Sequence, residues 1–120
     1  MNYRKFLIAA LLVMSFAVQA KDITVTRLTC EMRDGRVTTS DTPRLGWQMS
    51  SPENGTRQTA YEIEIRDVWA GKVVWNSGKV KSAQSQLVSC ADAVLEKDRH
   101  YTWRVRVWDE ADTPSAWSAP

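Results

Sequence analysis

Short stretches of strictly alternating polar and apolar side chains are the feature that most constrains the fold of this chain. In residues 60–67, Tyr61, Ile63 and Ile65 share one parity, and polar or charged residues occupy the positions between them. Residues 101–108 alternate in the same way, with aromatic and valine side chains set against arginines. Successive side chains of a strand point to opposite faces. Both stretches are therefore predicted to be strands with one face in a core and the other in water.

Further strands are predicted where β-favouring runs lie between turn signals. The first of them changes its apolar phase near Thr26 and Arg27, which indicates a β-bulge or bend. The last has an ambiguous phase, because Leu87 and Val88 cannot both face the core. No convincing amphipathic helix follows the first twenty residues, so the chain is predicted to be an all-β sandwich. The additional strands are expected over residues 23–32, 44–50, 73–75 and 84–90.

The first twenty residues have the layout of a secretory signal peptide. Two basic residues precede an apolar run over residues 6–18, which ends in the small-x-small pattern Val18-Gln19-Ala20. The run is too short, and wrongly flanked, for a membrane-spanning helix. Cleavage after Ala20 predicts a secreted or periplasmic protein with no membrane contact after cleavage. The expected organisation is a signal peptide over residues 1–20 and one β-sandwich over residues 21–120.

Charge and composition argue against several classes of partner and site. The chain has 16 basic and 14 acidic residues, and loss of Arg4 and Lys5 with the signal peptide leaves 14 of each. A chain of balanced charge lacks the basic stripe that nucleic acid or an anionic membrane requires. His100 is the only histidine, and Cys30 and Cys90 are the only cysteines. We therefore expect no zinc site, no Ser-His-Asp triad and no cofactor.

Cys30 and Cys90 are predicted to be free thiols. They lie on expected strands that flank a shared neighbour, which separates their Cα atoms by roughly 9–10 Å. A disulfide needs a Cα separation below about 7 Å. Two buried thiols that act as small apolar side chains are the favoured state. A disulfide stays open as the alternative, because an oxidising compartment permits one.

The acidic residues do not form a recognisable catalytic pair. Glu62 and Glu64 point the same way from one strand, and the pairing expected in a sandwich places Arg104 and Arg106 beside them. Such pairing lowers a carboxyl pKa, whereas glycoside hydrolysis needs a general acid whose pKa is raised. The acidic run over residues 109–112 is interpreted as a turn rather than a calcium site. We predict no catalytic residue and no metal ligand in this chain.

Six tryptophans are many for a chain of this size, and their rings can serve as flat platforms for sugars. Trp47 and Trp103 have the phase of core residues. Trp108 interrupts the polar face of its strand, and three alternatives remain open: it caps the end of the sandwich, packs on a neighbouring domain or binds sugar. Trp117 and Trp69 are, with Trp108, the candidates for a sugar or domain contact.

Four features in this order and spacing resemble a fibronectin type III domain. They are Leu45-Gly46-Trp47 in the second strand, the Tyr-x-Ile-x-Ile strand at 61–65, Leu95 six residues before Tyr101, and the tract Ser115-x-Trp117-Ser118. The third resembles a tyrosine corner, in which the Tyr hydroxyl bonds to backbone near the Leu. The resemblance implies a fibronectin type III or immunoglobulin-like β-sandwich. Its seventh strand barely begins before Pro120, so the sixth strand is expected to keep an open edge.

A narrower resemblance, over essentially all of residues 21–120, is to the amino-terminal module of bacterial α-L-rhamnosidases. In that family the module precedes further β-sandwiches and a catalytic (α/α) barrel, whose acidic residues hydrolyse terminal α-L-rhamnose with inversion. None of those catalytic motifs is in this chain. The segments that carry the resemblance are Leu28-Thr29-Cys30-Glu31, Thr42-Pro43-Arg44-Leu45-x-Trp47, Gln58-Thr59-Ala60-Tyr61, residues 74–80, residues 101–109 and Ser115-Ala116-Trp117-Ser118.

The resemblance implies a non-catalytic module of a secreted α-L-rhamnosidase. Its partners would be downstream domains of the same polypeptide, with rhamnose-containing glycans as a further candidate. Two alternatives of another class remain: a stand-alone carbohydrate-binding module and a cell-surface adhesion or adaptor domain. A β-sandwich serves all three, so the fold alone does not choose among them.

Overall fold

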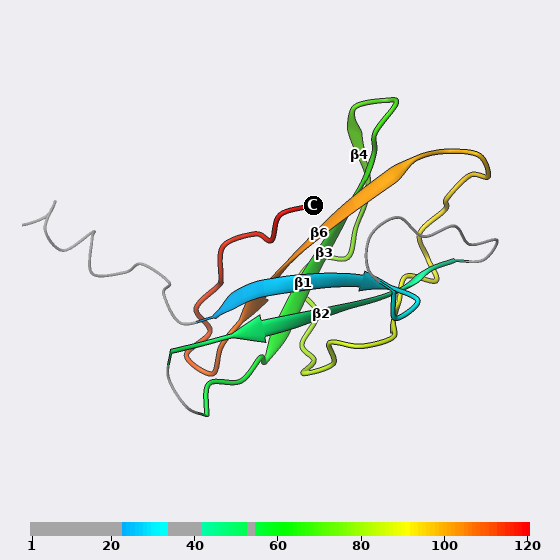
Figure 1. Ribbon diagram of the computed structural model, residues 1–120. Helices are drawn as coiled ribbons and strands as arrows, with labels where there is room; N and C mark the ends of the chain where they lie inside the picture. Colours follow the sequence, from blue (N-terminus) through cyan, green and yellow to red (C-terminus); the bar gives the residue numbers. More distant parts are fainter. Residues whose placement is uncertain (1–22, 34–41, 53–54) are drawn as a thin grey trace, which may run out of the picture.

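The computed structural model describes residues 23–33, 42–52 and 55–120, which form two three-stranded antiparallel sheets (Figure 1). One sheet has the strand order β1-β2-β5 and the other β4-β3-β6. This is the predicted all-β sandwich. The signal peptide and its cleavage site lie outside the described residues. The strands are β1 Thr24–Cys30, β2 Arg44–Ser50, β3 Ala60–Asp67, β4 Lys72–Asn76, β5 Val88–Ser89 and β6 Tyr101–Trp108.

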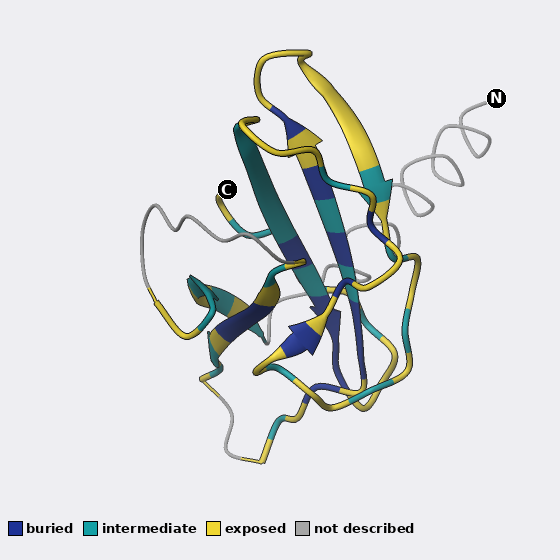
Figure 2. Ribbon diagram, turned by 90° about the vertical axis from the view of Figure 1, so that its right-hand side faces the viewer, coloured by how far each residue is buried: buried dark blue, intermediate teal, exposed yellow. Residues whose placement is uncertain are grey.

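The core lies where the apolar faces of the two sheets meet, as the buried segments in Figure 2 show. Trp47 of β2 is 2% exposed and packs edge-on against Tyr61 and Trp103, with ring centroids 5.3 and 6.4 Å away. Its indole Nε1 donates a 2.9 Å hydrogen bond to the buried side chain of Gln58. The Gln58 amide in turn donates to the carbonyls of Ser82 and Gln84. One buried polar chain thus ties the loop before β5 to the core. Among the described residues, no helix is long and apolar enough to cross a membrane.

The predicted β-bulge in the first strand is confirmed, whereas the predicted ends of β1, β4 and β5 are wrong, β4 by one residue at each end. The register of β1 against β2 shifts between Val25 and Arg27. β1 ends at Cys30, because Glu31 and Met32 take positive φ angles of 52° and 61° and turn the chain. A left-handed backbone conformation cannot continue a strand.

β5 is much shorter than the predicted 84–90 strand. Leu87 has a φ of 52° and is exposed, whereas Val88 is 1% exposed, so Val88 is the residue that faces the core. Before this point the chain still approaches β2, and the Ser85 carbonyl accepts a 2.8 Å bond from the Trp47 amide. Gly46 leaves room for this approach, because a Cβ atom there would lie 2.8 Å from the Thr29 Oγ1 and 3.2 Å from the Ser85 oxygen. A side chain there would require the Thr29 hydroxyl and the Ser85 carbonyl to shift.

Cys30 and Cys90 are free, as predicted. They lie on or just after β1 and β5, the two strands that flank β2. Cys90 is fully buried, and burial raises the pKa of its thiol to about 11. A neutral thiol in an apolar site packs as a small hydrophobic group. The tyrosine corner is also confirmed: the Tyr101 hydroxyl accepts a 2.9 Å bond from the backbone N–H of Glu96, the residue after Leu95.

The edge of β6 is not open over Val105–Asp109, so the predicted row of unpaired groups is wrong there. The amides of Ser115 and Ser118 donate to the carbonyls of Val107 and Val105, at 2.7 and 2.9 Å. The two serine hydroxyls accept bonds of 3.0 Å from the amides of the same two valines. Serine oxygens take the place of backbone carbonyls, and residues 113–120, here called the tail, therefore cover the edge without forming a regular strand.

Candidate functional site on the outer face of the β4-β3-β6 sheet

Two cross-strand ion pairs form the centre of this outer face. In the β3–β6 register, Glu62 is opposite Arg106 and Glu64 is opposite Arg104. The shortest separations between carboxylate oxygen and guanidinium nitrogen are 2.8 and 3.0 Å. The alternation of both strands dictates this arrangement, because directly opposed residues of antiparallel strands share a face. The predicted Glu–Arg pairs are confirmed.

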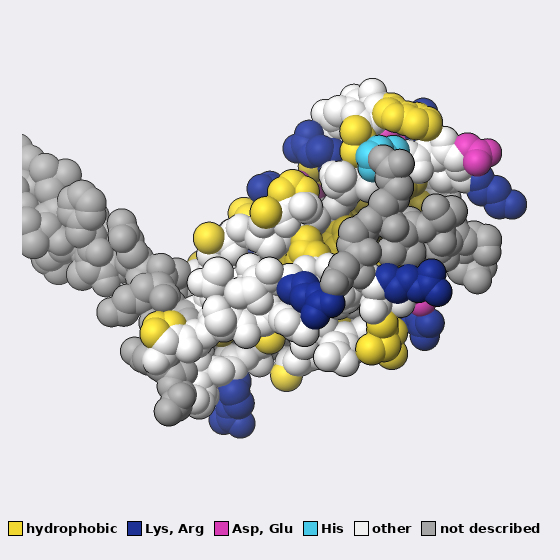
Figure 3. Space-filling model, viewed as in Figure 1, with side chains coloured by type: hydrophobic (Ala, Val, Ile, Leu, Met, Phe, Trp, Pro, Cys, Tyr) yellow, Lys and Arg dark blue, Asp and Glu magenta, His cyan; other side chains and the backbone are white. Residues whose placement is uncertain are grey.

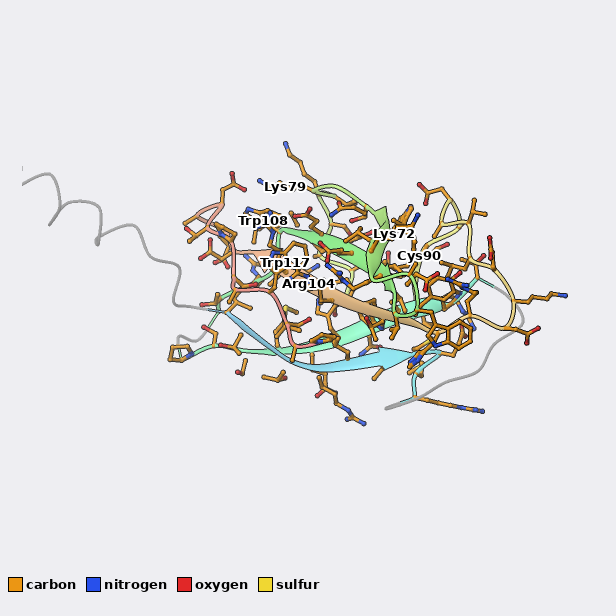
Figure 4. All side chains as sticks on the ribbon, turned by 90° about the horizontal axis from the view of Figure 1, so that it is seen from above. Lys72, Lys79, Cys90, Arg104, Trp108 and Trp117 are labelled. Carbon is orange, nitrogen blue, oxygen red and sulfur yellow. The ribbon has the colours of Figure 1, made fainter. Side chains whose placement is uncertain are left out.

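Aromatic rings alternate with these cations to form a stack along the face, here called the Trp–Arg ladder. The Trp117 ring lies between the guanidinium carbons of Arg104 and Arg106, at 4.4 and 4.8 Å. Arg106 is also 5.1 Å from the ring of Trp108, whose other neighbour is the Lys79 ammonium at 4.9 Å. Figure 4 shows Lys79, Trp108, Trp117 and Arg104 following one another along this side. Cation–π contacts of this kind hold the tail against β6.

The ladder limits how much of the Trp108 ring is accessible. Its side chain is only 8% exposed, with Lys79 and Arg106 close to its ring. A sugar-binding platform needs an accessible ring face, and the low exposure of Trp108 speaks against that role. Trp117 is half-buried in the same stack, so only part of its ring is accessible to solvent. Both residues are less exposed than Trp69, and their role as contact residues stays a prediction.

Trp69 has the opposite environment. It is 64% exposed in the turn between β3 and β4, and only the Arg99 guanidinium, 5.3 Å from the ring centroid, lies over it. Arg99 pairs with Asp67, which also accepts a 2.9 Å bond from the Ala70 amide. The Ala70 hydrogen bond, and after it the Arg99 pair, hold the pKa of Asp67 below its usual range. Of the three tryptophans predicted as candidate contact residues, Trp69 is the most exposed.

Two carboxyl groups of the described residues have clearly shifted pKa values. The carboxyl pKa values that the structure shifts, at Glu31 and Asp67, are both lowered, in each case by hydrogen bonds that include an arginine. A general acid of a glycosidase needs the opposite shift. Asp109 is buried, and its carboxylate accepts bonds from the Ala111 and Thr113 amides, so it forms the predicted turn. In the same described residues no cluster of His, Cys, Asp or Glu is suited to a metal ion.

A shallow groove of about 730 Å³ lies at the opposite end of the sandwich from Trp69. Its walls come from the end of β2, the segment before β3 and the segment after β4, and include Met49, Gln58, Lys81 and Glu110. The Arg57 amide donates to the Glu110 carboxylate across one side of it. The groove contains no stacked aromatic ring, the feature most typical of a sugar site.

Sequence reasoning missed two members of these clusters, Lys79 and Arg99. Both reach their tryptophan from a distant part of the chain: Lys79 lies 29 residues before Trp108, and Arg99 lies 30 residues after Trp69. Neither position has a local pattern that indicates a ring partner. Only the pairing of strands brings these segments together.

Comparison with known proteins identifies the module. Residues 25–120 match the family described as Rha78A-like, N-terminal immunoglobulin domain. An α-L-rhamnosidase of Streptomyces avermitilis is 46% identical over 81 residues, which are 65% of this chain and 8% of that protein. An α-L-rhamnosidase of Formosa agariphila is 33% identical over 88 residues, which are 68% of this chain and 9% of that protein.

Solved structures agree with the family match. The crystal structure of Streptomyces avermitilis α-L-rhamnosidase complexed with L-rhamnose has a TM-score of 0.75 at 39% identity, over 82% of this chain and 10% of that one. The α-L-rhamnosidase from Dictyoglumus thermophilum has a TM-score of 0.74 at 27% identity, over 84% of this chain and 12% of that one. This chain thus spans less than a tenth of the length of the curated relatives it matches. The chain belongs to the family of Rha78A-like, N-terminal immunoglobulin domains.

Proposed function

We propose that this chain is the non-catalytic amino-terminal module of a secreted α-L-rhamnosidase and that it braces the domains that follow it. Hydrolysis of terminal α-L-rhamnose would take place in a domain outside these residues. The observation that carries the proposal is the 46% identity to a small part of an α-L-rhamnosidase. The ion-paired Glu62 and Glu64, which are held by arginines, support a structural role for the module.

The test starts from the gene. The reading frame is sequenced beyond codon 120, and the complete protein is expressed with and without residues 21–120. We expect an α-helical barrel rich in acidic residues downstream, rhamnosidase activity in the complete protein and none in residues 21–120 alone. Removing the module should lower the thermal midpoint of the enzyme, because a buried contact between domains is lost. A stop codon after Pro120, or activity in the isolated module, contradicts the proposal.

Export of the protein is part of the same proposal. The first twenty residues carry the signal-peptide layout, with its cleavage pattern at Val18-Gln19-Ala20. Amino-terminal sequencing of the protein recovered from the periplasm or culture medium should begin at Lys21. A protein that stays in the cytoplasm with Met1 in place contradicts secretion and leaves the module assignment intact.

A glycan-binding module is the second candidate, and the exposed ring of Trp69 is what favours it. A pyranose ring can stack on an exposed indole, while a neighbouring arginine and carboxylate bond to its hydroxyls. Residues 21–120 are titrated with rhamnose-containing oligosaccharides while tryptophan fluorescence is recorded. A saturable change that disappears in Trp69→Ala but persists in Trp117→Ala supports glycan binding. An unchanged spectrum up to millimolar ligand rejects it.

A further inference from the structure

Exposed apolar side chains are concentrated at one place on this module. Of the seven large hydrophobic residues exposed among the described residues, four lie within residues 68–74, in the hairpin that joins β3 to β4. The other three, Met32, Leu87 and Val94, lie in separate turns and loops. Single exposed apolar residues are normal, whereas a group of them marks a contact surface. The group, here called the hairpin surface, consists of Val68, Trp69, Val73 and Val74, which are 40, 64, 42 and 38% exposed.

The hairpin surface is held in place rather than left loose. The Val68 amide donates to the His100 carbonyl, and the Gly71 amide donates to the Asp67 carbonyl, both at 2.9 Å. The Arg66 guanidinium donates to the Gly71 carbonyl at 3.2 Å. Gly71 has a φ of 66°, which a glycine adopts without strain. Figure 2 shows the hairpin projecting from the sandwich with its tip exposed, and Figure 3 shows hydrophobic side chains at the upper end of the molecule.

The tail runs toward the end of the sandwich that carries this hairpin. Ser115 pairs with Val107 and Ser118 with Val105, so the tail is antiparallel to β6 and runs toward the Tyr101 end of that strand. In the register, Tyr101 is opposite Asp67, the residue at which the hairpin turn begins. Pro120 lines a small hollow of about 150 Å³ together with Arg66, Thr102 and Arg104. Figure 1 shows that the tail runs in the direction of the end from which the β3–β4 turn projects.

Residues beyond Pro120 would therefore start close to the hairpin surface. In the pairing of β3 with β4, Val73 is opposite Arg66, the residue that shares the hollow with Pro120. A polypeptide that continues from this point reaches the hairpin surface without crossing the body of the sandwich. In the relatives, most of the polypeptide lies outside the matched segment, which is 8–9% of their length.

We propose that the hairpin surface is where this module docks onto the following part of the α-L-rhamnosidase polypeptide. This inference rests on the proposed function and adds to it the face that makes the contact. The partner surface is apolar at its centre, to receive Trp69, and bears carboxylates at its rim. We infer the carboxylates of the partner from Arg66 and Lys72, two cations that border the hairpin surface. They take part in none of the ion pairs among the described residues. An aromatic anchor within a charged border is the usual anatomy of a stable interface.

Hydroxyl-radical footprinting with mass spectrometry tests the contact directly. The oxidation rate of Trp69 is measured in residues 21–120 alone and in the complete enzyme. We expect the rate to fall about fivefold or more in the enzyme, as a side chain that is 64% exposed becomes interface core. The peptide that contains Leu87, an exposed residue in the segment before β5, is the internal control and should keep its rate. An unchanged Trp69 rate overturns the proposal.

Paired substitutions supply a second measurement. Trp69→Ser combined with Val73→Ser should leave the thermal midpoint of residues 21–120 unchanged and lower that of the complete enzyme by several degrees. Leu87→Ser, the matched control, should change neither. A double variant that lowers both midpoints equally, or neither, overturns the docking surface.

The outcomes separate this inference from the proposed function. If deletion of the module destabilises the enzyme while Trp69 keeps its isolated oxidation rate, the module braces the enzyme through another face. If the reading frame contains no rhamnosidase downstream, the proposed function fails, and the docking surface fails with it. If rhamnose-containing oligosaccharides protect Trp69 in the isolated module and the rest of the enzyme does not, the surface is a glycan site and the docking proposal is overturned.

Discussion

The two edges of the β4-β3-β6 sheet differ in how far the rest of the module covers them. At the β6 edge, Ser115 and Ser118 satisfy the backbone groups of two buried valines, and Trp117 is stacked between two arginines. At the β4 edge, Val73 and Val74 are exposed, next to Trp69. An unprotected apolar edge is a liability in a protein that acts alone. The first edge is thus completed within the module, and the exposure of the second supports the proposal that it makes a contact outside the module.

Loss of the tail should produce the largest effect. Deleting residues 115–120 exposes the amides of Val105 and Val107 and removes the Trp117 ring from the ladder. We expect the free energy of unfolding to fall by about 3–5 kcal/mol, because buried amides lose their partners together with a packed aromatic ring. Urea denaturation of residues 21–120 and 21–114 measures it. Coincident unfolding curves would show that the tail does not protect this edge.

The substitution Trp117→Ala should have the next largest effect on stability. Its ring contacts both Arg104 and Arg106, and we expect a loss of about 2 kcal/mol from cation–π contact and partial burial. Trp69→Ala on the other edge is the matched control and should change the stability of the isolated module by less than about 0.5 kcal/mol. Equal effects of the two substitutions in denaturation experiments would remove the contrast between the edges.

Ser118→Ala isolates one hydrogen bond of the closed edge. The hydroxyl accepts a 3.0 Å bond from the amide of Val105, a residue with no exposed surface. Leaving a buried amide without its acceptor should cost about 1–2 kcal/mol. Ser89→Ala, at an exposed position of β5, should be neutral within about 0.5 kcal/mol. Stability that is unaffected by Ser118→Ala would mean that water or another group replaces the hydroxyl.

Low pH should weaken the β3–β4 hairpin by protonating Asp67. We expect this to be the smallest of the effects on stability. The folded state holds the pKa of Asp67 below its unfolded value, mainly through the Ala70 amide and then through Arg99. The stabilisation is therefore present above the ordinary aspartate pKa and is lost as pH falls through the lowered one. The Ala70 amide resonance should titrate with a midpoint below that of an ordinary aspartate. Asp67→Asn should abolish that transition. A midpoint at the ordinary aspartate pKa would contradict the stabilisation of the Asp67 carboxylate by the Ala70 amide and Arg99.

Local patterns predicted the long strands and the tyrosine corner, and they were less reliable at the ends of strands. The alternation in 60–67 and 101–108 gave β3 and β6 with their observed bounds. The predicted 84–90 strand shrank to two residues because the left-handed backbone at Leu87 is not visible in a pattern of apolar residues. The open β6 edge was predicted wrongly for a related reason. Serine hydroxyls that replace backbone carbonyls have no strand-like signature.

The sequence by itself determined the class of this protein, because the period of two along a strand is a local property and the order of its motifs resembles one family of modules. The tertiary structure alone decided which tryptophans are buried and which is exposed. Trp108 is buried beside Lys79 and Arg106, whereas Trp69 projects from a turn that Asp67 and Arg99 hold. The physical reason is that the exposure of a ring depends on which distant segments pack over it. That packing is set by strand pairing across the whole domain rather than by the residues next to the ring.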